Sequence, residues 1–171
     1  RNKIGWVSQD PFIFSSTIES NISLGVDADK IDFERVVYAA KIADLHNHIM
    51  SLPQQYKTPI SERGLNISGG QRQRLSIARA VYYDPEIYIF DEATSSLDST
   101  SERKVQNAIE KLSSERKTII AIAHRFSTLF NADCIYVLRN GEVVDSGTHK
   151  QLVNKVNGLY AKLYTEQSSS N

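Results

Sequence analysis

The order of apolar and polar residues divides the chain into a helix-rich part and a part in which strands and helices alternate. Runs of β-branched and aromatic residues predict five strands, at residues 4–8, 87–90, 118–123, 135–138 and 142–145. Asn140 and Gly141 separate the last two, and Asn-Gly between apolar runs is a strong hairpin signal. Apolar residues at helical spacing predict helices over residues 32–42, 71–82, 101–112 and 148–156, with Asp32 as the N-cap of the first.

These elements predict an α/β fold with an inserted helical region. Helix-rich sequence fills residues 17–83, whereas strands and helices alternate from Ile87 onwards. Alternation of this kind is typical of a largely parallel sheet with helices packed on it. The helix that begins near Gln71 should end before Asp84 and Pro85, because the residue before a proline is disfavoured in helical conformation.

Composition narrows the class of protein. The 171 residues fall within the usual size of one domain, and 40% of them are apolar, enough to form a core. Lys and Arg together number 20, as do Asp and Glu, so the balanced charge argues against nucleic-acid binding through bulk charge. The single cysteine, Cys134, excludes an internal disulfide and a cysteine-rich zinc site, and suits a reducing compartment. No apolar run approaches the ~20 residues needed to span a bilayer.

Two adjacent carboxylates give the sharpest chemical signal. Asp91 and Glu92 follow the apolar strand at residues 87–90, which would carry them to the carboxyl edge of the sheet, where open α/β sheets bind ligands. Neighbouring residues of a strand point to opposite faces, so the two acids cannot do the same job. One could hold a hydrated Mg²⁺, and the other could orient or deprotonate a water for attack on phosphorus. A strand that simply ends in solvent at two acids is the open alternative.

A serine and two glycines precede the helix that begins near Gln71. A serine N-cap followed by Gly69 and Gly70 leaves several backbone N–H groups open, which suits an anion such as phosphate. An ordinary loop and N-cap at Ser68 would have the same sequence.

Residues at the ends of two other predicted strands are weaker signals. His124 could hydrogen-bond a phosphate oxygen or the attacking water, and the amide of Gln9 could ligate Mg²⁺, although both residue types are usually structural at such positions. His46 and His48 lie in helical sequence, where residues two apart face different ways, and predict no metal site.

Taken together, these residues resemble the motifs of the ATP-binding cassette (ABC) ATPases, in the same order and at similar spacing. The resemblance is carried by Gln9 as the Q-loop glutamine, Ser68, Gly69, Gly70 and Gln71 as the signature motif, Asp91 and Glu92 as the Walker B pair, Ser96, Leu97 and Asp98 as the D-loop, and His124 as the switch histidine. Residues 17–22, 58–64, 123–128 and 158–160 are further similar to the exporter branch, in which the ATPase domain is fused behind a transmembrane domain. Ile67 stands where leucine is usual in the signature motif, and Ser61 where glycine is common in the exporter X-loop.

One motif of that family does not occur in the sequence. The loop that holds the phosphates of ATP reads G-x-x-x-x-G-K-[ST], and none of the eight glycines is followed by lysine. In the family this loop precedes the Q-loop and would lie upstream of Arg1. The resemblance therefore implies the C-terminal portion of an exporter ATPase domain: an incomplete P-loop NTPase core with a mainly parallel sheet and an inserted α-helical subdomain. Unpaired strand edges in such a core would favour low stability or self-association.

The resemblance also implies an organisation of the chain. Residues 1–16 would form the Q-loop strand and loop, residues 17–83 the helical subdomain with the X-loop and signature motif, and residues 84–171 the remaining core with its C-terminal helices. The serine-rich end at residues 168–171 is expected to fray.

Roles follow from the same resemblance. Two ATPase domains would pair head to tail around ATP, with the signature residues Ser68, Gly69, Gly70 and Gln71 meeting the γ-phosphate held by the partner domain. On the chain's own nucleotide, Asp91 and Gln9 would serve Mg²⁺, Glu92 would polarise the attacking water, His124 would sense the γ-phosphate, and Asp98 would couple the two sites. The implied function is ATP hydrolysis that powers export, at the cytoplasmic face of a membrane, with a transmembrane domain as the second partner.

Two alternatives stay open from the sequence. A soluble cassette ATPase acting on DNA or ribosomes is one, but only 61 residues separate Gln9 from Gln71, and they carry no sustained heptads of the kind found in chromosome-organising relatives. No nucleic-acid partner is therefore expected. The other is a non-catalytic binding module, which the missing phosphate-binding loop would permit.

Overall fold

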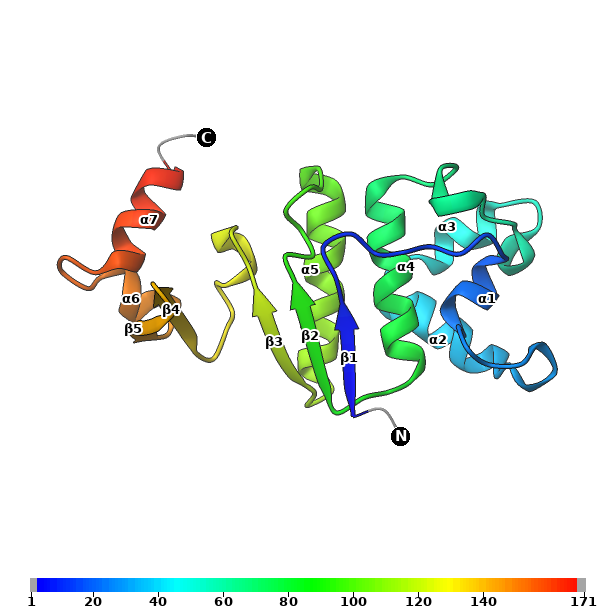
Figure 1. Cartoon of the computed structure of the whole chain (residues 1–171), viewed down its shortest axis with the longest axis horizontal. Coiled ribbons are helices and arrows are strands. Elements are labelled where there is room, and N and C mark those ends of the chain that lie inside the picture. Colours follow the sequence, from blue (N-terminus) through cyan, green and yellow to red (C-terminus); the bar gives the residue numbers. More distant parts are fainter. Residues whose placement is uncertain (1–2, 169–171) are drawn as a thin grey trace. The chain divides into compact units, whose positions relative to one another are not determined.

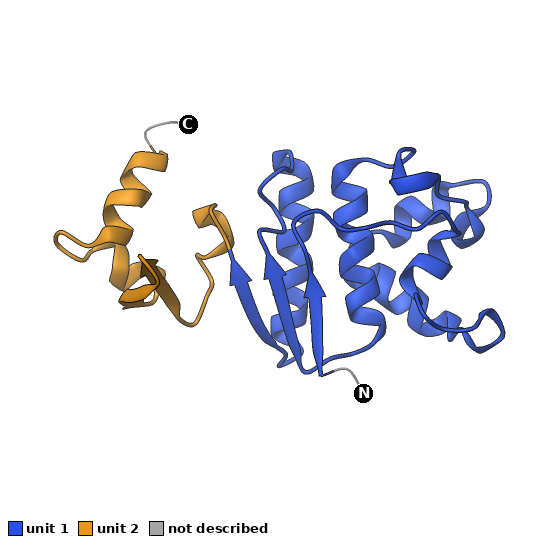
Figure 2. Cartoon of the chain, viewed as in Figure 1, with its two compact units in different colours: residues 1–122 blue, residues 123–171 orange. Residues whose placement is uncertain are grey.

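The structure is a computed structural model that describes residues 3–168 (Figure 1). The chain groups into two compact units, residues 1–122 and residues 123–171 (Figure 2). The first unit contains a parallel sheet and the longer helices, and the second contains a β-hairpin followed by two helices. Of the serine-rich end expected to fray, residues 169–171 lie outside the described part of the chain.

Three parallel strands form the sheet of the first unit, in the order β1–β2–β3. They are β1 (Ile4–Val7), β2 (Ile87–Asp91) and β3 (Thr118–Ile122), close to the ranges expected from the sequence. The register pairs Val7 with Phe90 and Asp91 with Ile122, so the three strands end at a common carboxyl edge. The predicted parallel sheet of an α/β fold is thus confirmed.

Five α-helices and three 3₁₀ turns complete the described part of the first unit. The helices are α1 (Ile18–Ile22), α2 (Phe33–Ile42), α3 (His46–Ser51), α4 (Gly69–Tyr82) and α5 (Ser99–Ser114), and the turns lie at Ala28–Lys30, Gln55–Lys57 and Glu62–Gly64. Asp32 caps α2 as predicted, because its Oδ1 accepts a hydrogen bond from the Arg35 backbone N–H at 3.1 Å. Helices α4 and α5 each begin two residues earlier than the apolar spacing predicts, because their N-caps are Ser68 and Asp98.

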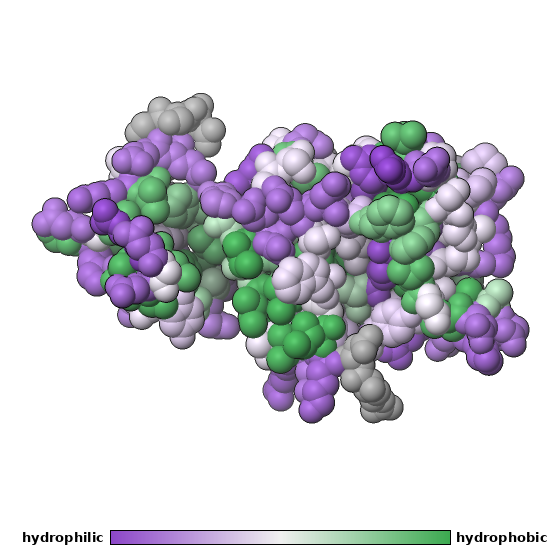
Figure 3. Space-filling model, in the orientation of Figure 1, coloured by the Kyte–Doolittle hydropathy of each residue, from purple (hydrophilic) through white to green (hydrophobic). Residues whose placement is uncertain are grey.

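The two faces of the sheet differ in burial. Val7, Tyr88 and Phe90 point to one face and are almost fully buried, on the side where α4 packs against β1 and α5 against β3 (Figure 1). The opposite face presents four large apolar side chains, each at least half exposed: Ile4, Trp6, Ile120 and Ile122. Apolar side chains gather over the strands on this face in Figure 3.

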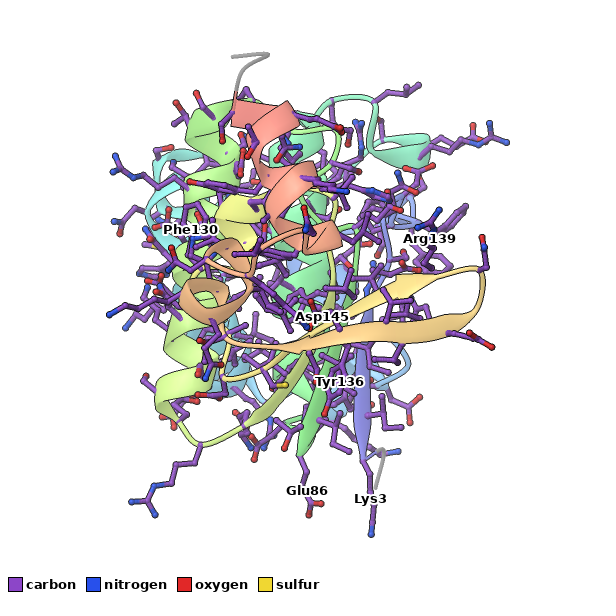
Figure 4. The ribbon with its side chains drawn as sticks, turned by 90° about the vertical axis from the view of Figure 1, so that its left-hand side faces the viewer. Lys3, Glu86, Phe130, Tyr136, Arg139 and Asp145 are labelled. Carbon is purple, nitrogen blue, oxygen red and sulfur yellow. The ribbon has the colours of Figure 1, made fainter. Side chains whose placement is uncertain are left out.

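The second unit is built on an antiparallel hairpin with its own small core. Strands β4 (Ile135–Arg139) and β5 (Glu142–Gly147) are joined at Asn140 and Gly141, whose φ angles of 54° and 83° suit the predicted Asn-Gly turn. Helices α6 (His149–Val153) and α7 (Leu159–Ser168) follow, α6 being shorter than the predicted 148–156. The core of this unit comprises Ile135, Val137, Leu152 and Tyr160. Figure 4 shows the hairpin with Arg139 beside its turn.

The helices carry one further property relevant to function. Across residues 3–168, none of them combines the length and the apolar character that crossing a bilayer requires.

Candidate functional site

The carboxyl edge of the sheet carries the two predicted acids. Asp91 ends β2 on the face opposite the buried side chains of Tyr88 and Phe90, and both acids are half-buried. Glu92 has already left the strand: its φ is 47°, and its backbone N–H donates to the Ile122 carbonyl oxygen at 2.9 Å. The orientation of Glu92 is therefore set by this turn rather than by simple alternation along the strand.

Gln9 reaches the same edge from the segment after β1. Its side-chain Nε2 donates to Ser95 Oγ at 3.1 Å, and that hydroxyl donates to the Glu92 carbonyl oxygen at 3.0 Å. A chain of hydrogen bonds thus connects the predicted Q-loop glutamine to the turn that holds the predicted base. Because the nitrogen of the Gln9 amide makes this bond, its Oε1 is the atom suited to a cation.

The predicted signature residues form the start of α4. Ser68 Oγ accepts from the Gln71 backbone N–H at 3.2 Å, while Gln71 Oε1 accepts from the Ser68 N–H at 2.8 Å, so the two residues form a capping box. Ser68 and Gly69 are exposed, which leaves the first turn of the helix open to a ligand. The N-terminal end of a helix favours anions through its unpaired N–H groups and its dipole.

Gly70 is the second residue of α4, and it lies close to the start of α5. A Cβ added to Gly70 would lie 2.3 Å from Ser101 Oγ and 2.6 Å from Ser101 Cβ, so only glycine fits without displacement of the neighbouring helix. Asp98 is the N-cap of α5, and its Oδ1 accepts from the Ser101 N–H at 2.9 Å. Hydrogen bonds from Ser101 lower the pKa of the Asp98 carboxyl below its ordinary value. Ser101 therefore links the predicted signature glycine to the predicted D-loop aspartate.

A buried arginine lies close to the same junction. Arg74 is 5% exposed, and its Nε and Nη1 have no hydrogen-bond partner among residues 3–168. Burial lowers the pKa of its guanidinium, and the carboxylates of Asp44 and Asp98 act in the opposite direction. Arg74 lies on α4 itself and thus places a buried positive charge within reach of the carboxylates of Asp44 and Asp98.

His124, the remaining predicted site residue, belongs to the second unit. It follows β3 by two residues, and its backbone oxygen accepts a hydrogen bond from Gln167 Nε2 at 3.1 Å. Within the first unit, Gln9, Asp91 and Glu92 lie at one sheet edge, and the signature residues and Asp98 meet at the facing starts of α4 and α5.

Three contacts of the site are absent from the predictions made on the sequence. Ser95 connects Gln9 to Glu92, Gln73 Nε2 donates to the Ser8 carbonyl oxygen at 3.0 Å, and His48 Nε2 lies 2.9 Å from Gln71 Nε2. Each joins residues far apart in the chain, so spacing along the sequence gives no signal for it. His48 lies in helical sequence without a metal-binding pattern, so the sequence gives no reason to single it out.

The architecture defines an α/β protein with acids at the carboxyl edge of a parallel sheet and a glycine-rich helix start, as in nucleotide-binding proteins. The family described as "ABC transporter" matches residues 1–95 of the chain. The chain therefore belongs to the ABC transporter family, and its closely similar relatives make it a nucleotide-binding domain of the exporter type.

Relatives and a solved structure agree with this assignment. A Staphylococcus aureus (strain NCTC 8325) protein named for multidrug export as an ATP-binding/permease protein is 50% identical over 168 residues, which cover 98% of this chain and 28% of that protein. Its counterpart in the bovine strain RF122 is 49% identical over the same length. The structure of a bacterial Atm1-family ABC exporter with ATP bound matches 97% of this chain with a TM-score of 0.86 and 40% identity.

The match covers nearly all of this chain but only a part of each longer relative. The chain spans 28% of the length of the S. aureus relative and 29% of the Atm1-family exporter chain. The similarity favours the exporter over a soluble ATPase acting on DNA or ribosomes, and over a non-catalytic binding module.

Proposed function

We propose that this chain is part of an ATPase domain that powers export of a substrate across a membrane. The observation that carries the proposal is the hydrogen-bonded connection from Gln9 through Ser95 to Glu92 at the carboxyl edge of the sheet. It ties a glutamine to the turn that follows Asp91 and carries Glu92, which suits a site that must hold a cation and orient a water beside phosphate.

Glu92 is the proposed group that acts on the attacking water. Its backbone is held by the Ile122 carbonyl oxygen, and the hydrogen bonds from Ser95 fix the turn that follows. With the backbone held in this way, the Glu92 carboxylate can accept a hydrogen bond from a water and hold it in line with the γ-phosphorus of ATP. His124 is proposed to contact the γ-phosphate.

The oxygen donors at this edge fit a magnesium ion. Asp91 offers a carboxylate, and Gln9 offers its amide oxygen because its nitrogen is bonded to Ser95. Magnesium in nucleotide sites is commonly held by one or two protein oxygens together with phosphate and water. When bound with ATP, Mg²⁺ would neutralise charge on the phosphate oxygens.

The start of α4 is proposed to act on ATP held by a second ATPase domain. Ser68 and Gly69 are exposed at the helix end, where the dipole favours the γ-phosphate. Because the Ser68 N–H is bonded to Gln71 Oε1, Gly69 carries the exposed backbone N–H. Gly70 and Gln71 would complete this contact, and Asp98 would couple the two sites because Ser101 joins its cap to Gly70. The proposed pair of domains is head to tail.

The segment after Gln9 is proposed to contact the transmembrane domain. Phe12 and Phe14 are 59% and 42% exposed and pack edge to face at 4.8 Å between ring centroids. Asn21 holds the Phe14 backbone through both of its amide atoms, and Arg79 Nη1 donates to the Phe12 carbonyl oxygen at 2.9 Å. Exposed aromatic side chains on a fixed backbone suit a protein partner.

The organisation inferred from the sequence remains the proposal for the assembled transporter. Residues 17–83 would form the helical subdomain, and residues 1–16 and 84–171 parts of the core, all at the cytoplasmic face of the membrane. Since none of its glycines is followed by lysine, the chain alone is proposed to be inactive. Calorimetric titration of the chain with Mg²⁺–ATP should show no binding, and micromolar binding would contradict this part of the proposal.

Replacement of Glu92 by Gln tests the proposed function in the transporter that contains this chain. The amide keeps the size of the side chain but loses its charge, so ATP should bind while hydrolysis falls on the order of 100-fold or more. The matched control is Glu86→Gln, at the opposite end of β2, where Glu86 points away from the sheet (Figure 4). Steady-state hydrolysis and retained nucleotide are measured for both, and hydrolysis at the wild-type rate in Glu92→Gln would remove Glu92 from this role.

A further inference from the structure

His48 and Gln71 make a contact whose polarity can be worked out from the rest of the network. His48, on α3, is exposed, and its Nε2 lies 2.9 Å from Gln71 Nε2. The other end of the Gln71 amide, Oε1, lies 2.8 Å from the Ser68 backbone nitrogen. A backbone N–H can only donate, so the atom that faces Ser68 is the amide oxygen and the atom that faces His48 is the NH₂ group.

This assignment fixes the state of the histidine. An amide NH₂ group has no acceptor capacity, so His48 Nε2 must be the acceptor and must carry no proton. The ring is then neutral, with its proton on Nδ1. A ring protonated on Nε2 would place two donors 2.9 Å apart, and the Gln71 amide would leave either the histidine or the cap of α4.

The helix that carries His48 is itself held in place. His46 Nδ1 and the Tyr56 hydroxyl are 2.8 Å apart, and Ile49 is buried in the main core. His48 and Gln71 also line the same cavity of about 180 Å³, together with Thr58 and Ile67. Helix α3 therefore offers a fixed hydrogen-bond acceptor, His48 Nε2, to the first turn of α4.

We propose that His48 is a positioning residue for the signature motif, acting by holding the Gln71 side chain in its capping orientation. The proposal rests on the function proposed above. The order of contacts is His48 to Gln71, and Gln71 to Ser68, the residue whose exposed helix end would meet the γ-phosphate of the partner domain. Without the acceptor, Gln71 samples other rotamers, and the backbone of Ser68 is held less firmly.

Two substitutions of His48 separate hydrogen bonding from packing. Leucine fills a similar space without an acceptor, whereas glutamine places an amide oxygen at about the reach of Nε2. In the transporter, we expect His48→Leu to lower kcat roughly 3- to 10-fold, the size associated with one lost neutral hydrogen bond. His48→Gln should stay within about two-fold of the wild type, since it restores the acceptor.

The controls address specificity and fold. Asn47→Leu puts the same side chain on the neighbouring position of α3, where Asn47 is exposed and its side chain bonds to none of the residues the structure describes, and should leave kcat unchanged. The affinity for ADP, which lacks the γ-phosphate, should not change in any variant. In a Gln71→Leu background, His48→Leu should have no further effect, because its action passes through Gln71.

A measurement independent of hydrolysis tests the contact itself. ¹⁵N NMR of the histidine rings in the chain should show His48 neutral and protonated on Nδ1, with Nε2 shifted as an acceptor. A proton on Nε2 would overturn the proposal, and so would equal kcat in His48→Leu and the wild type. If the wild-type transporter hydrolyses no ATP, the proposed function fails, while the ring signal still decides whether the contact exists.

Discussion

Gly69 and Gly70 are neighbours of the same residue type that meet different surroundings. An added Cβ at Gly69 would come no closer than 3.7 Å to another residue, at Arg72 Nη2, whereas at Gly70 it would overlap Ser101. Gly69 therefore keeps the exposed end of α4 free of a side chain, whereas Gly70 allows α4 to approach α5 closely. The sequence motif treats them alike, but packing gives them separate functions.

Alanine at these two positions should have opposite effects on stability. We expect Gly70→Ala to lower the free energy of unfolding by about 1–3 kcal/mol, because Ser101 Cβ belongs to a helix and cannot rotate away. Gly69→Ala should be neutral or slightly stabilising, since alanine is favoured over glycine in a helix by roughly 0.5–1 kcal/mol. Urea unfolding of the two variants is the measurement, and equal stabilities would contradict the packing argument.

Helix α5 is capped at its start by the carboxylate of Asp98. Asp98→Ala should lower the free energy of unfolding, whereas Asp98→Asn should lower it much less because asparagine is an equally good N-cap. The lowered pKa sets the pH dependence: the stabilisation by the charged cap is complete above pH 3.8 and is lost as the pH falls through the folded-state pKa. Because asparagine does not titrate, the wild type should lose stability relative to Asp98→Asn as the pH falls below 3.8 in denaturation curves, and a constant difference between the two would argue against the charged cap.

The elements show where sequence patterns are sufficient and where they are not. Strands β1, β2 and β3 follow from apolar runs, and α2 follows from its spacing and from Asp32. Apolar spacing predicts the start of α4 two residues too late, because its first turn is stabilised by a capping box rather than by apolar contacts. Short helices such as α1 and α3 are stabilised mainly by tertiary packing, for which periodicity gives no bounds.

The candidate site shows the same division. The order of motifs predicts Asp91, Glu92 and the signature residues, because each lies at the end of a recognisable element. The connection of Gln9 to Ser95 spans 86 residues and depends on the pairing of β1 with β2, which no local pattern determines. The acceptor role of His48 depends likewise on the approach of α3 to α4.

At the scale of the whole molecule, the exposed sheet face is the feature with the largest consequence. Trp6 on β1 and Ile122 on β3 are 58% and 51% exposed on this face, and both strands are edge strands of the sheet. Apolar surface of this kind, beside unpaired strand edges, favours association.

The isolated chain should therefore self-associate or unfold at low denaturant concentration. Sedimentation at increasing concentration should show species heavier than 19.2 kDa, and Trp6→Lys should shift the distribution towards the monomer. Tyr136→Lys, on the exposed side of β4 in the second unit, tests whether the effect belongs to this face. A monomer at all concentrations with one sharp unfolding transition would contradict the prediction.

The backbone conformation of Glu92 limits how far the thermal stability of this protein could be raised by selection. A non-glycine residue at a φ of 47° is held in a conformation that costs roughly 1–2 kcal/mol, and glycine there would relax it. Selection for thermal stability alone would therefore favour glycine at position 92. That substitution would remove the carboxylate on which the proposed hydrolysis depends. Directed evolution of a heat-resistant variant would have to screen for turnover as well as for survival on heating.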